Sequence, residues 1–320
     1  MALPTSGPLT LDQIHIEAGG SSGTLCSLND ADIRGIINKS VNALNAFSDY
    51  RGQSAETTLT SGGTVNGQAQ RQEITVSSFI ASGETLRIPS SMWVWSDSTS
   101  TAALTIDIPC TVVNDGKIIG KGGNGGNGFY SVASAGGPAI NVTSSGVTIT
   151  NSSGAFIAGG GGGGGSFSDY SNPSDAHSGG GGGAGGGTGG LGRVNSGYWQ
   201  GGVGGALNAS GANGGNGYAS AGQGGGSGGG GGGHYYGGGG GGRILAGTGG
   251  GGGNSAGDGG SAGNAGISGG PYVYSLAGGG GGWGAAGGLG GGRRAGGAGG
   301  AAIQGTSRTL NNSGTIYGST

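Results

Sequence analysis

Few side chains in this sequence are spaced so that they could catalyse a reaction or hold a metal ion. Its three histidines are His15, His177 and His234, and they lie in unrelated contexts. The one tempting cluster is His177 with Asp169 and Asp175, and the Ser, Asn and Pro residues around them are typical of a solvated loop. No carboxylate pair and no Ser, His and Asp set falls on a predicted rigid element. We therefore predict no catalytic site, no metal site and no cofactor, and hence a protein that is not an enzyme.

Two further patterns resemble chemical motifs but lack the context that those motifs need. Residues 122–128 fit a GxGxxG pattern, yet no strand–helix–strand unit surrounds them, so a dinucleotide site is not indicated. Cys26 and Cys110 lie far apart and outside any metal-ligand spacing. We expect two buried thiols rather than a disulfide or a zinc site.

Composition excludes several classes of protein. Of 320 residues 95 are glycine but only 7 are proline, and no Gly-X-Y register is sustained, which excludes collagen. With 12 Lys and Arg against 14 Asp and Glu, there is no basic face for nucleic acid. The N-terminus lacks the basic start and apolar stretch of a signal peptide, and no window is apolar enough to span a membrane. We expect a soluble chain that is made in a cytoplasm.

Glycine is concentrated in one block, which divides the chain near residue 118. Residues 1–117 contain 11 glycines, 118–302 contain 81 and 303–320 contain 3. In the first part, apolar residues recur at helical spacing from Leu9 to Ile16 and from Ala31 to Leu44, with Asn29 or Asp30 as the N-cap of the second stretch. This pattern predicts a small helical module over residues 1–55.

Strand patterns follow the helical module. Alternation of apolar and polar residues at 72–77 and 104–108 predicts a β-rich shoulder over residues 56–117. An Asn-to-Gly turn followed by an apolar strand then recurs at 113–120, 151–159 and 312–318. Such a unit is typical of one coil of a β-solenoid or of a β-hairpin. Residues 303–320 are expected to return as a closing strand, so the glycine-rich block is framed by similar strands.

The glycine-rich block has two possible structures, a flexible linker or a packed bundle. Its spacing favours the bundle. From Trp283 to Ala301 every third position is mostly a residue other than glycine, while the two positions between are mostly glycine, and from Gly257 to Gly269 glycines fall three apart. Period three is the repeat of the polyproline II backbone, and glycine lets such helices approach until their amides and carbonyls bond laterally. We predict a mostly irregular and β protein in which residues 118–302 form a bundle of packed polyglycine II helices with distal loops.

Aromatic residues interrupt the glycine tracts. Of 19 aromatic residues in the chain, 13 lie in 118–302. Tyr and Trp among Ser, Gly and Asn are typical of binding loops, because rigid rings give contact area at a low entropic cost. Alternation of loops between the two ends of a bundle predicts four loops at the free end, namely 129–135, 166–178, 218–223 and 270–277. The loops at 193–200 and 234–236 would then face the N-terminal half.

The predicted receptor-binding residues are the aromatic and polar residues of these distal loops. They are Phe129, Tyr130, Phe167, Asp169, Tyr170, His177, Tyr218, Tyr272 and Tyr274. The same rings could instead pack against the bundle as part of its core.

The glycine-rich half resembles a known family. Residues 119–125, 147–151 and 155–165 carry a glycine tract, a strand and a second strand that leads into a long glycine run, in the order found in the adhesin at the tip of T-even-type phage long tail fibres. The resemblance covers about residues 110–320. It implies a polyglycine II domain whose variable distal loops bind outer-membrane proteins of Gram-negative hosts. The loop with Phe167, Asp169, Tyr170 and His177 matches a receptor-contacting segment.

The first 55 residues resemble a different element. Ser6 to Ile14, with Phe47 to Gly52 at the end, are similar to a short leader of many phage tail proteins. This implies attachment to a tail-fibre or tail-tip protein of the virion, but by a mode of docking that departs from the T-even pattern. We expect an adhesin at the tip of a tail fibre, made in the host cytoplasm, whose receptor is an outer-membrane protein, with lipopolysaccharide as a substitute or additional receptor.

Two other functions fit the composition. A structural or ice-binding protein similar to the glycine-rich antifreeze proteins of snow fleas would need one flat face of small residues and disulfide-stapled helices, and the irregular aromatic loops argue against it. A disordered glycine-rich wall protein would be proteolysed rapidly throughout 118–302.

Overall fold

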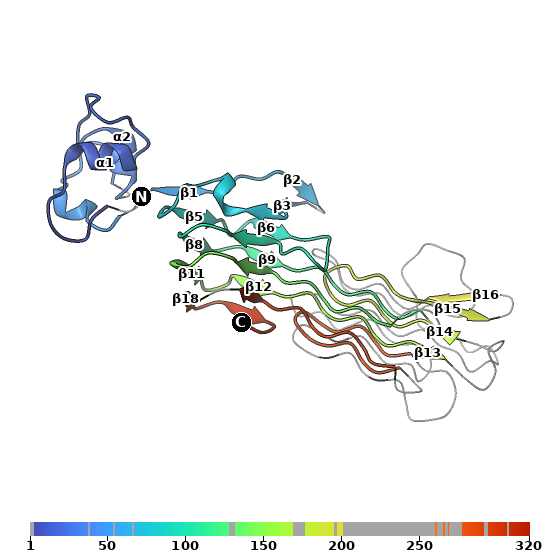
Figure 1. The fold of residues 1–320 in the computed structure, drawn as a ribbon. Coiled ribbons are helices and arrows are strands. Elements are labelled where there is room, and N and C mark those ends of the chain that lie inside the picture. Colours follow the sequence, from blue (N-terminus) through green and yellow to red (C-terminus); the bar gives the residue numbers. More distant parts are fainter. Residues whose placement is uncertain are drawn as a thin grey trace.

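The protein is elongated and mostly β, with two α-helices in its described part. The computed structural model describes residues 3–37, 39–53, 55–65, 67–127, 132–168, 177–194, 197–200, 260, 265, 268, 277–290, 294–305 and 307–320. Figure 1 shows a helical module at the N-terminal end, stacked strands beside it and glycine-rich segments that extend away from both.

The N-terminal module has a small core of its own. It contains α1 (Leu11–Glu17), α2 (Ala31–Gly35) and a 3₁₀ turn (Phe47–Tyr50). Thr10 caps α1, since its side chain accepts from the backbone N–H of Gln13 while the Gln13 side chain accepts from the Thr10 N–H. The buried side chains at the centre of the module come from all of its parts, and they are Leu3, Ile14, Ile33 and Tyr50.

The second helix is much shorter than the apolar spacing predicts. Asp30, one of the two expected N-cap residues, is the N-cap, but α2 ends at Gly35 instead of continuing to Leu44. The Arg34 guanidinium donates to the Ser40 carbonyl at 2.9 Å, and the Lys39 amide donates to the Arg34 carbonyl at 3.1 Å, so the chain turns back directly after the helix. Leu44 consequently lies in an exposed loop.

The strands form a parallel β-solenoid with three sheets. The first sheet contains β1 (Glu56–Thr58), β5 (Thr85–Ile88), β8 (Thr111–Asn114), β11 (Val147–Asn151) and β18 (Arg308–Asn312). The second contains β2 (Gly63–Val65), β3 (Gln68–Gln72), β6 (Met92–Trp95), β9 (Lys117–Ile119), β12 (Phe156–Ala158) and β19 (Thr315–Tyr317). The third contains β4 (Ile74–Thr75), β7 (Leu104–Ile106), β10 (Ile140–Val142) and β17 (Ile303–Gly305).

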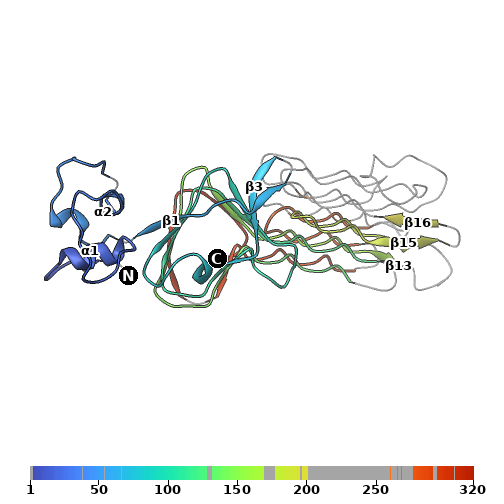
Figure 2. The ribbon, with the colours of Figure 1, turned by 90° about the horizontal axis from the view of Figure 1, so that it is seen from above.

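Each coil of the solenoid visits the three sheets in turn. Figure 2 looks nearly along the stack, where the coils overlie one another as a closed outline. All pairs between coils are parallel and in register, and only the β2–β3 hairpin is antiparallel within these sheets. Because register is kept, like positions stack into rows, and the inward row of the first sheet is Leu86, Val112 and Ile149, all fully buried.

An asparagine row occupies the corner between the first and second sheets. Asn114, Asn151 and Asn312 are in register there. The Asn114 amide donates to the Asn151 side-chain oxygen at 2.8 Å, and the Asn151 amide donates to that of Asn312 at 2.8 Å. These are the asparagines of the recurring Asn-to-Gly pattern. Of its two interpretations, a β-solenoid coil and a β-hairpin, the structure has the solenoid coil.

The glycine-rich segments are insertions at another corner of the same solenoid. The connection from the second to the third sheet becomes longer in each successive coil. It is the single residue 73 in the first coil, residues 96–103 in the second, 120–139 in the third and 159–302 in the fourth. Strands β10, β11 and β12 lie between the last two insertions and continue the solenoid. The glycine segments therefore leave the solenoid side by side, because successive coils are stacked (Figure 1).

Backbone hydrogen bonds hold the glycine segments together. The N–H groups of residues 160–165 donate in rotation to three neighbours, residues 134–137, 181–184 and 285–288, at 2.7–3.0 Å. The carbonyls of residues 158–165 accept from three others, residues 120–126, 278–284 and 297–300, at 2.7–2.9 Å. Within each partner the bonds recur every third residue. The run 159–165 is thus surrounded by six segments.

Side chains are excluded from this arrangement by close packing. A Cβ atom built on Gly162 would lie 1.9 Å from the Gly297 carbonyl oxygen, and one on Gly160 would lie 1.8 Å from that of Lys121. Glycine is required at both positions because the backbones themselves are in contact.

Both cysteines are free thiols. Cys110 is buried, as expected, whereas Cys26 is only half-buried. Burial raises the pKa of the Cys110 thiol to about 11, which keeps it protonated near neutral pH. Across the described ranges, no group of three His, Cys, Asp or Glu side chains could hold a metal ion, and no helix has both the length and the apolar character to cross a membrane.

Candidate recognition site

Two short antiparallel strand pairs lie at the end of the glycine segments. β13 (Phe167–Ser168) pairs with β14 (His177–Ser178), and β15 (Leu191–Val194) pairs with β16 (Gly197–Gln200). Figure 1 shows both pairs at the end of the molecule farthest from the N-terminal module. β14 also contacts β15, so the two pairs form one group, which we call the distal strand group.

The path of the chain explains why both pairs reach the same end. Residues 159–166 run outward from the solenoid, and residues 178–184 return antiparallel to them, since Gly161 N donates to Ala184 O and Gly164 N to Gly181 O. The chain then reverses at Gly185 and Gly186, whose φ angles are +99° and +77°. Both angles lie in the left-handed region, which favours glycine. Residues 187–190 run outward again and lead into β15.

The predicted position of the loop at 193–200 is therefore wrong. It was expected to face the N-terminal half, because loops of a bundle alternate between the two ends. The reversal at Gly185 and Gly186 is itself a turn at the end that faces the solenoid, and it does not interrupt the glycine tract. A turn made of glycine inside a glycine run gives no compositional signal, so the count of loops was one short.

Two of the predicted receptor-binding residues lie in the distal strand group. Phe167 pairs with Ser178, and His177 pairs with Ser168, at the base of the loop that joins β13 to β14. The other predicted residues lie outside the described part of the chain, and they are Phe129, Tyr130, Asp169, Tyr170, Tyr218, Tyr272 and Tyr274. The acidic neighbours of His177, Asp169 and Asp175, also lie outside it.

The hairpin of β15 and β16 brings further residues to this end that sequence reasoning did not place there. Arg193 pairs with Tyr198, and Gly192 pairs with Trp199. A signal for the hairpin was present, because two short runs with Val, Tyr and Trp are separated by only two residues, Asn195 and Ser196.

An aromatic cluster joins the glycine segments to the solenoid. Trp283 is fully buried and packs with Trp93, Ile119, Phe156 and Ala184 on the outer side of the second sheet. The Lys117 ammonium lies 4.7 Å from the centroid of the Trp93 ring, a cation–π contact, and burial lowers the pKa of Lys117. This cluster is a side-chain contact between the two regions, in addition to their backbone hydrogen bonds.

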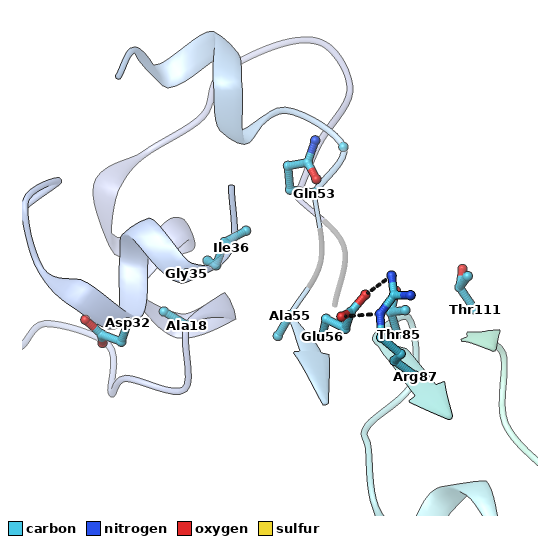
Figure 3. Close-up of a pocket in the computed structure, with 11 residues that line it drawn as sticks. Ala18, Asp32, Gly35, Ile36, Gln53, Ala55, Glu56, Thr85, Arg87 and Thr111 are labelled. Atoms are coloured by element: carbon cyan, nitrogen blue, oxygen red, sulfur yellow. Dashed lines mark hydrogen bonds and ion pairs between the residues drawn. The ribbon is translucent and has the colours of Figure 1, made fainter. Parts of the chain in front are cut away.

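A cleft of about 850 Å³ separates the N-terminal module from the first sheet. Figure 3 shows Asp32 and Ile36 on the module side and Thr85, Arg87 and Thr111 on the sheet side. Glu56 accepts from Arg87 Nε at 2.7 Å and from Nη2 at 3.0 Å, as Figure 3 also shows.

Arg87, on the sheet side of this cleft, is paired with two carboxylates, those of Glu56 and Asp115. Asp115 accepts from the third guanidinium nitrogen, Arg87 Nη1. The hydrogen bonds that Arg87 donates to Glu56 and Asp115 raise the pKa of Arg87. Burial opposes ionisation of Asp115, but hydrogen bonds from Ser152 and Arg87 outweigh it and lower the pKa of this carboxyl. The arrangement joins neighbouring coils and leaves no charged group of this set poised for acid–base chemistry.

The protein is thus a β-solenoid with glycine-rich insertions, and short strand pairs lie at the far end of these insertions. A family model described as "Phage tail fibre adhesin Gp38" matches residues 55–232, more than half of the chain. The chain therefore belongs to the phage tail fibre adhesin Gp38 family, which confirms the family indicated by the sequence. Membership makes it a virion protein of a tail fibre, with a role in recognition.

Comparison with solved structures gives a match over almost the whole chain. A chain of the gp37–gp38 adhesin tip complex from the long tail fibre of bacteriophage S16 is 20% identical, with a TM-score of 0.47, and the match covers 98% of this chain and 99% of that one. The search of curated proteins found no match.

Proposed function

We propose that this adhesin binds a receptor on the host cell surface, an outer-membrane protein of a Gram-negative bacterium, through the loops and strands at its distal end. The observation that carries the proposal is the position of the distal strand group, at the opposite end from the N-terminal module (Figure 1). An adhesin must present its receptor-binding surface away from the virion. An elongated molecule can do so when one end is attached to the virion and the other end carries the receptor-binding surface.

We further propose that the glycine segments form a polyglycine II lattice. The rotation of hydrogen bonds around residues 160–165, with a repeat of three residues and six neighbours, supports this assignment. A lattice of backbone hydrogen bonds holds the loops rigidly without a side-chain core. Loop sequences can therefore change with the receptor while the scaffold stays the same.

The division of labour that we propose follows the chain. Residues 1–55 attach to a tail-fibre or tail-tip protein, 56–117 form a shoulder, 118–302 bind the receptor and 303–320 close the fold. The compact core of the N-terminal module supports its separate role. Synthesis in the host cytoplasm, and lipopolysaccharide as a substitute or additional receptor, belong to the same proposal.

Binding of the purified, labelled protein to whole cells tests the receptor. The panel contains Gram-negative strains, mutants that each lack one outer-membrane protein, and mutants with truncated lipopolysaccharide. We expect saturable binding that one protein deletion abolishes. Binding that follows lipopolysaccharide truncation alone would replace the protein receptor by a sugar, and indifference of the folded protein to every strain would refute the proposal.

Single substitutions test which residues contact the receptor. Tyr170→Ala and Tyr272→Ala are expected to weaken binding by about tenfold or more, because aromatic residues dominate binding energies at such surfaces. Thr309→Ala on the exposed side of β18 is the matched control and should bind like the parent protein. Loss of soluble protein on changing either tyrosine would assign that ring to the core instead.

A further inference from the structure

Exposed apolar side chains gather on the N-terminal module. Within the described residues, seven large hydrophobic side chains are exposed, and the five in the module are Ile16, Leu25, Val41, Leu44 and Phe47. Leu25 is 103% exposed and Leu44 is 94% exposed. Outside the module only Val132 and Leu289 belong to this set, and neither exceeds 70% exposure. Five of the seven thus belong to one small module, where exposed apolar side chains are candidates for contact with a partner.

The loops that carry the two leucines are held in place by side-chain hydrogen bonds. Before Leu25, the Thr24 hydroxyl donates to the Ser21 carbonyl at 2.6 Å and lies 2.7 Å from His15 Nε2. The Lys39 ammonium donates to the Leu44 carbonyl at 2.9 Å and pairs with Asp49 at 2.8 Å. Each leucine therefore projects from a fixed backbone, so its insertion into a partner would require little ordering of the loop.

The same two loops are joined to each other. The Asn29 side-chain amide donates to Asn42 Oδ1 at 2.9 Å, and the Asn42 backbone N–H donates to Asn29 Oδ1 at 2.8 Å. The Asn45 amide donates to the Leu28 carbonyl at 3.0 Å. Leu25 and Leu44 thus belong to one rigid unit and can engage a single partner together.

Three carboxylates lie near Cys26, the residue that follows Leu25. Next to Leu25, burial and the nearby carboxylates of Asp30, Asp12 and Asp32 raise the pKa of the Cys26 thiol. Apolar projections with an acidic surround fit a partner that offers apolar pockets with a basic rim.

We propose that Leu25 and Leu44 are the anchors by which this adhesin docks, and that they insert into apolar, basic-rimmed pockets on the tail-fibre protein of the virion. The inference rests on the proposed attachment role of the module. The module lies at the end of the molecule opposite the distal strand group, which is the end that faces the virion when the other end faces the host (Figure 1).

Reconstitution with phage particles tests the anchors. Particles of the phage that encodes this chain are produced without it and are mixed with the labelled full-length chain, and co-sedimentation gives the apparent Kd. Leu25→Ser and Leu44→Ser should each raise the Kd about tenfold, and the double variant about a hundredfold, because each removes a buried leucine from the interface. Leu289→Ser changes an exposed leucine outside the module and should leave the Kd unchanged.

Thermal unfolding of the variants provides a check on folding. Both leucines are almost fully exposed, so the double variant should unfold at the same temperature as the parent chain. A double variant that is folded and docks with an unchanged Kd would overturn the assignment of the anchors.

Amine cross-linking separates this inference from the attachment role itself. The chain has three lysines, Lys39 in the module and Lys117 and Lys121 far from it in the sequence. Cross-links from the fibre protein to Lys39 support attachment through the module. If the double variant also docks normally, the role of the two leucines as anchors is refuted while attachment through the module stands. Cross-links to Lys117 or Lys121 only would refute attachment through the module.

Discussion

The β-solenoid and the glycine bundle are joined in one chain but are stabilised in opposite ways. The solenoid has a continuous core of buried Val, Leu and Ile side chains, stacked in rows by the parallel register. Around residues 159–165 the bundle has no such side chains, and its contacts are backbone hydrogen bonds to six neighbours. The first depends on apolar burial, and the second depends on lateral hydrogen bonds and close backbone packing.

This difference determines which substitutions each region can accept. A side-chain core can lose or shift a methyl group, because neighbouring side chains adjust. Backbones in direct contact cannot adjust, so the bundle should be intolerant of even one added carbon atom.

The largest effect is expected for Gly162→Ala. The added Cβ would lie 1.9 Å from the Gly297 carbonyl oxygen and 2.5 Å from its carbon, so two segments must separate. We expect a loss of more than about 3 kcal/mol, at or beyond the upper end for overpacking. Differential scanning calorimetry should show a bundle transition that is lowered or absent.

Gly35→Ala in the N-terminal module is the matched control for this change. A Cβ at Gly35 meets no atom within 4 Å, and its φ is not in the left-handed region. The control should therefore leave stability unchanged or raise it slightly. Equal destabilisation by both substitutions would show that close packing is not what excludes side chains from the bundle.

A smaller effect is expected in the solenoid core from Ile149→Ala. Ile149 is fully buried between Val112 and Leu310 in the inward row of the first sheet. Truncation should cost about 2–5 kcal/mol, and Ile149→Val only about 0.5–1.5 kcal/mol. Urea unfolding measures both values. A cost for the valine variant as large as that of Gly162→Ala would remove the contrast between the two regions.

The asparagine row should contribute less than the apolar core. Asn151→Ala leaves the buried Asn114 amide without its partner at 2.8 Å and removes the donor to Asn312. The expected loss is about 1–3 kcal/mol, because buried polar groups are left unpaired. Asn312→Ala, at the exposed end of the row, should cost less than Asn151→Ala. Urea unfolding measures both losses of stability. Equal losses for Asn151→Ala and Asn312→Ala would show that burial does not determine how much each asparagine of the row contributes.

Much of the solenoid could be anticipated from the sequence. The three Asn-to-Gly units mark the same corner in three coils, since turn chemistry is local and is written in residue types at fixed spacing. The N-cap at Asp30 was predictable for the same reason, whereas the end of α2 was not. That end depends on the contacts of Arg34 with Ser40 and Asn29, which apolar spacing does not encode.

The order of segments in the bundle is the part that the sequence could not give. Glycine runs have no side chains to distinguish one neighbour from another, so nothing local indicates that residues 160–165 bond to 134–137 and 285–288. The reversals at Gly185 and Gly284, with φ of +99° and +66°, are likewise invisible within glycine tracts. Hence the loop at 193–200 is predicted at the wrong end, although the two strands of its hairpin have a recognisable pattern.

The smallest predicted effect concerns acid, which should act on the solenoid and spare the bundle. The pKa of Asp115 is lowered in the folded protein, so its pairing with Arg87 stabilises the fold above the unfolded pKa of about 4 and is lost as the pH falls through the lower folded value. Because the Arg87 side chain is 35% exposed, this contribution should be about 1 kcal/mol or less. Residues 159–165 are all glycine and have no side chain to titrate. Amide hydrogen exchange at pH 5 and pH 3, corrected for the intrinsic rate, should therefore show reduced protection in β5 and β8 and unchanged protection at 159–165. Asp115→Asn should make the reduction in the solenoid smaller, and the rest is due to other carboxyls with a lowered pKa, such as Asp107. Equal loss of protection in both regions would mean that the bundle is stable only as long as the solenoid beneath it is.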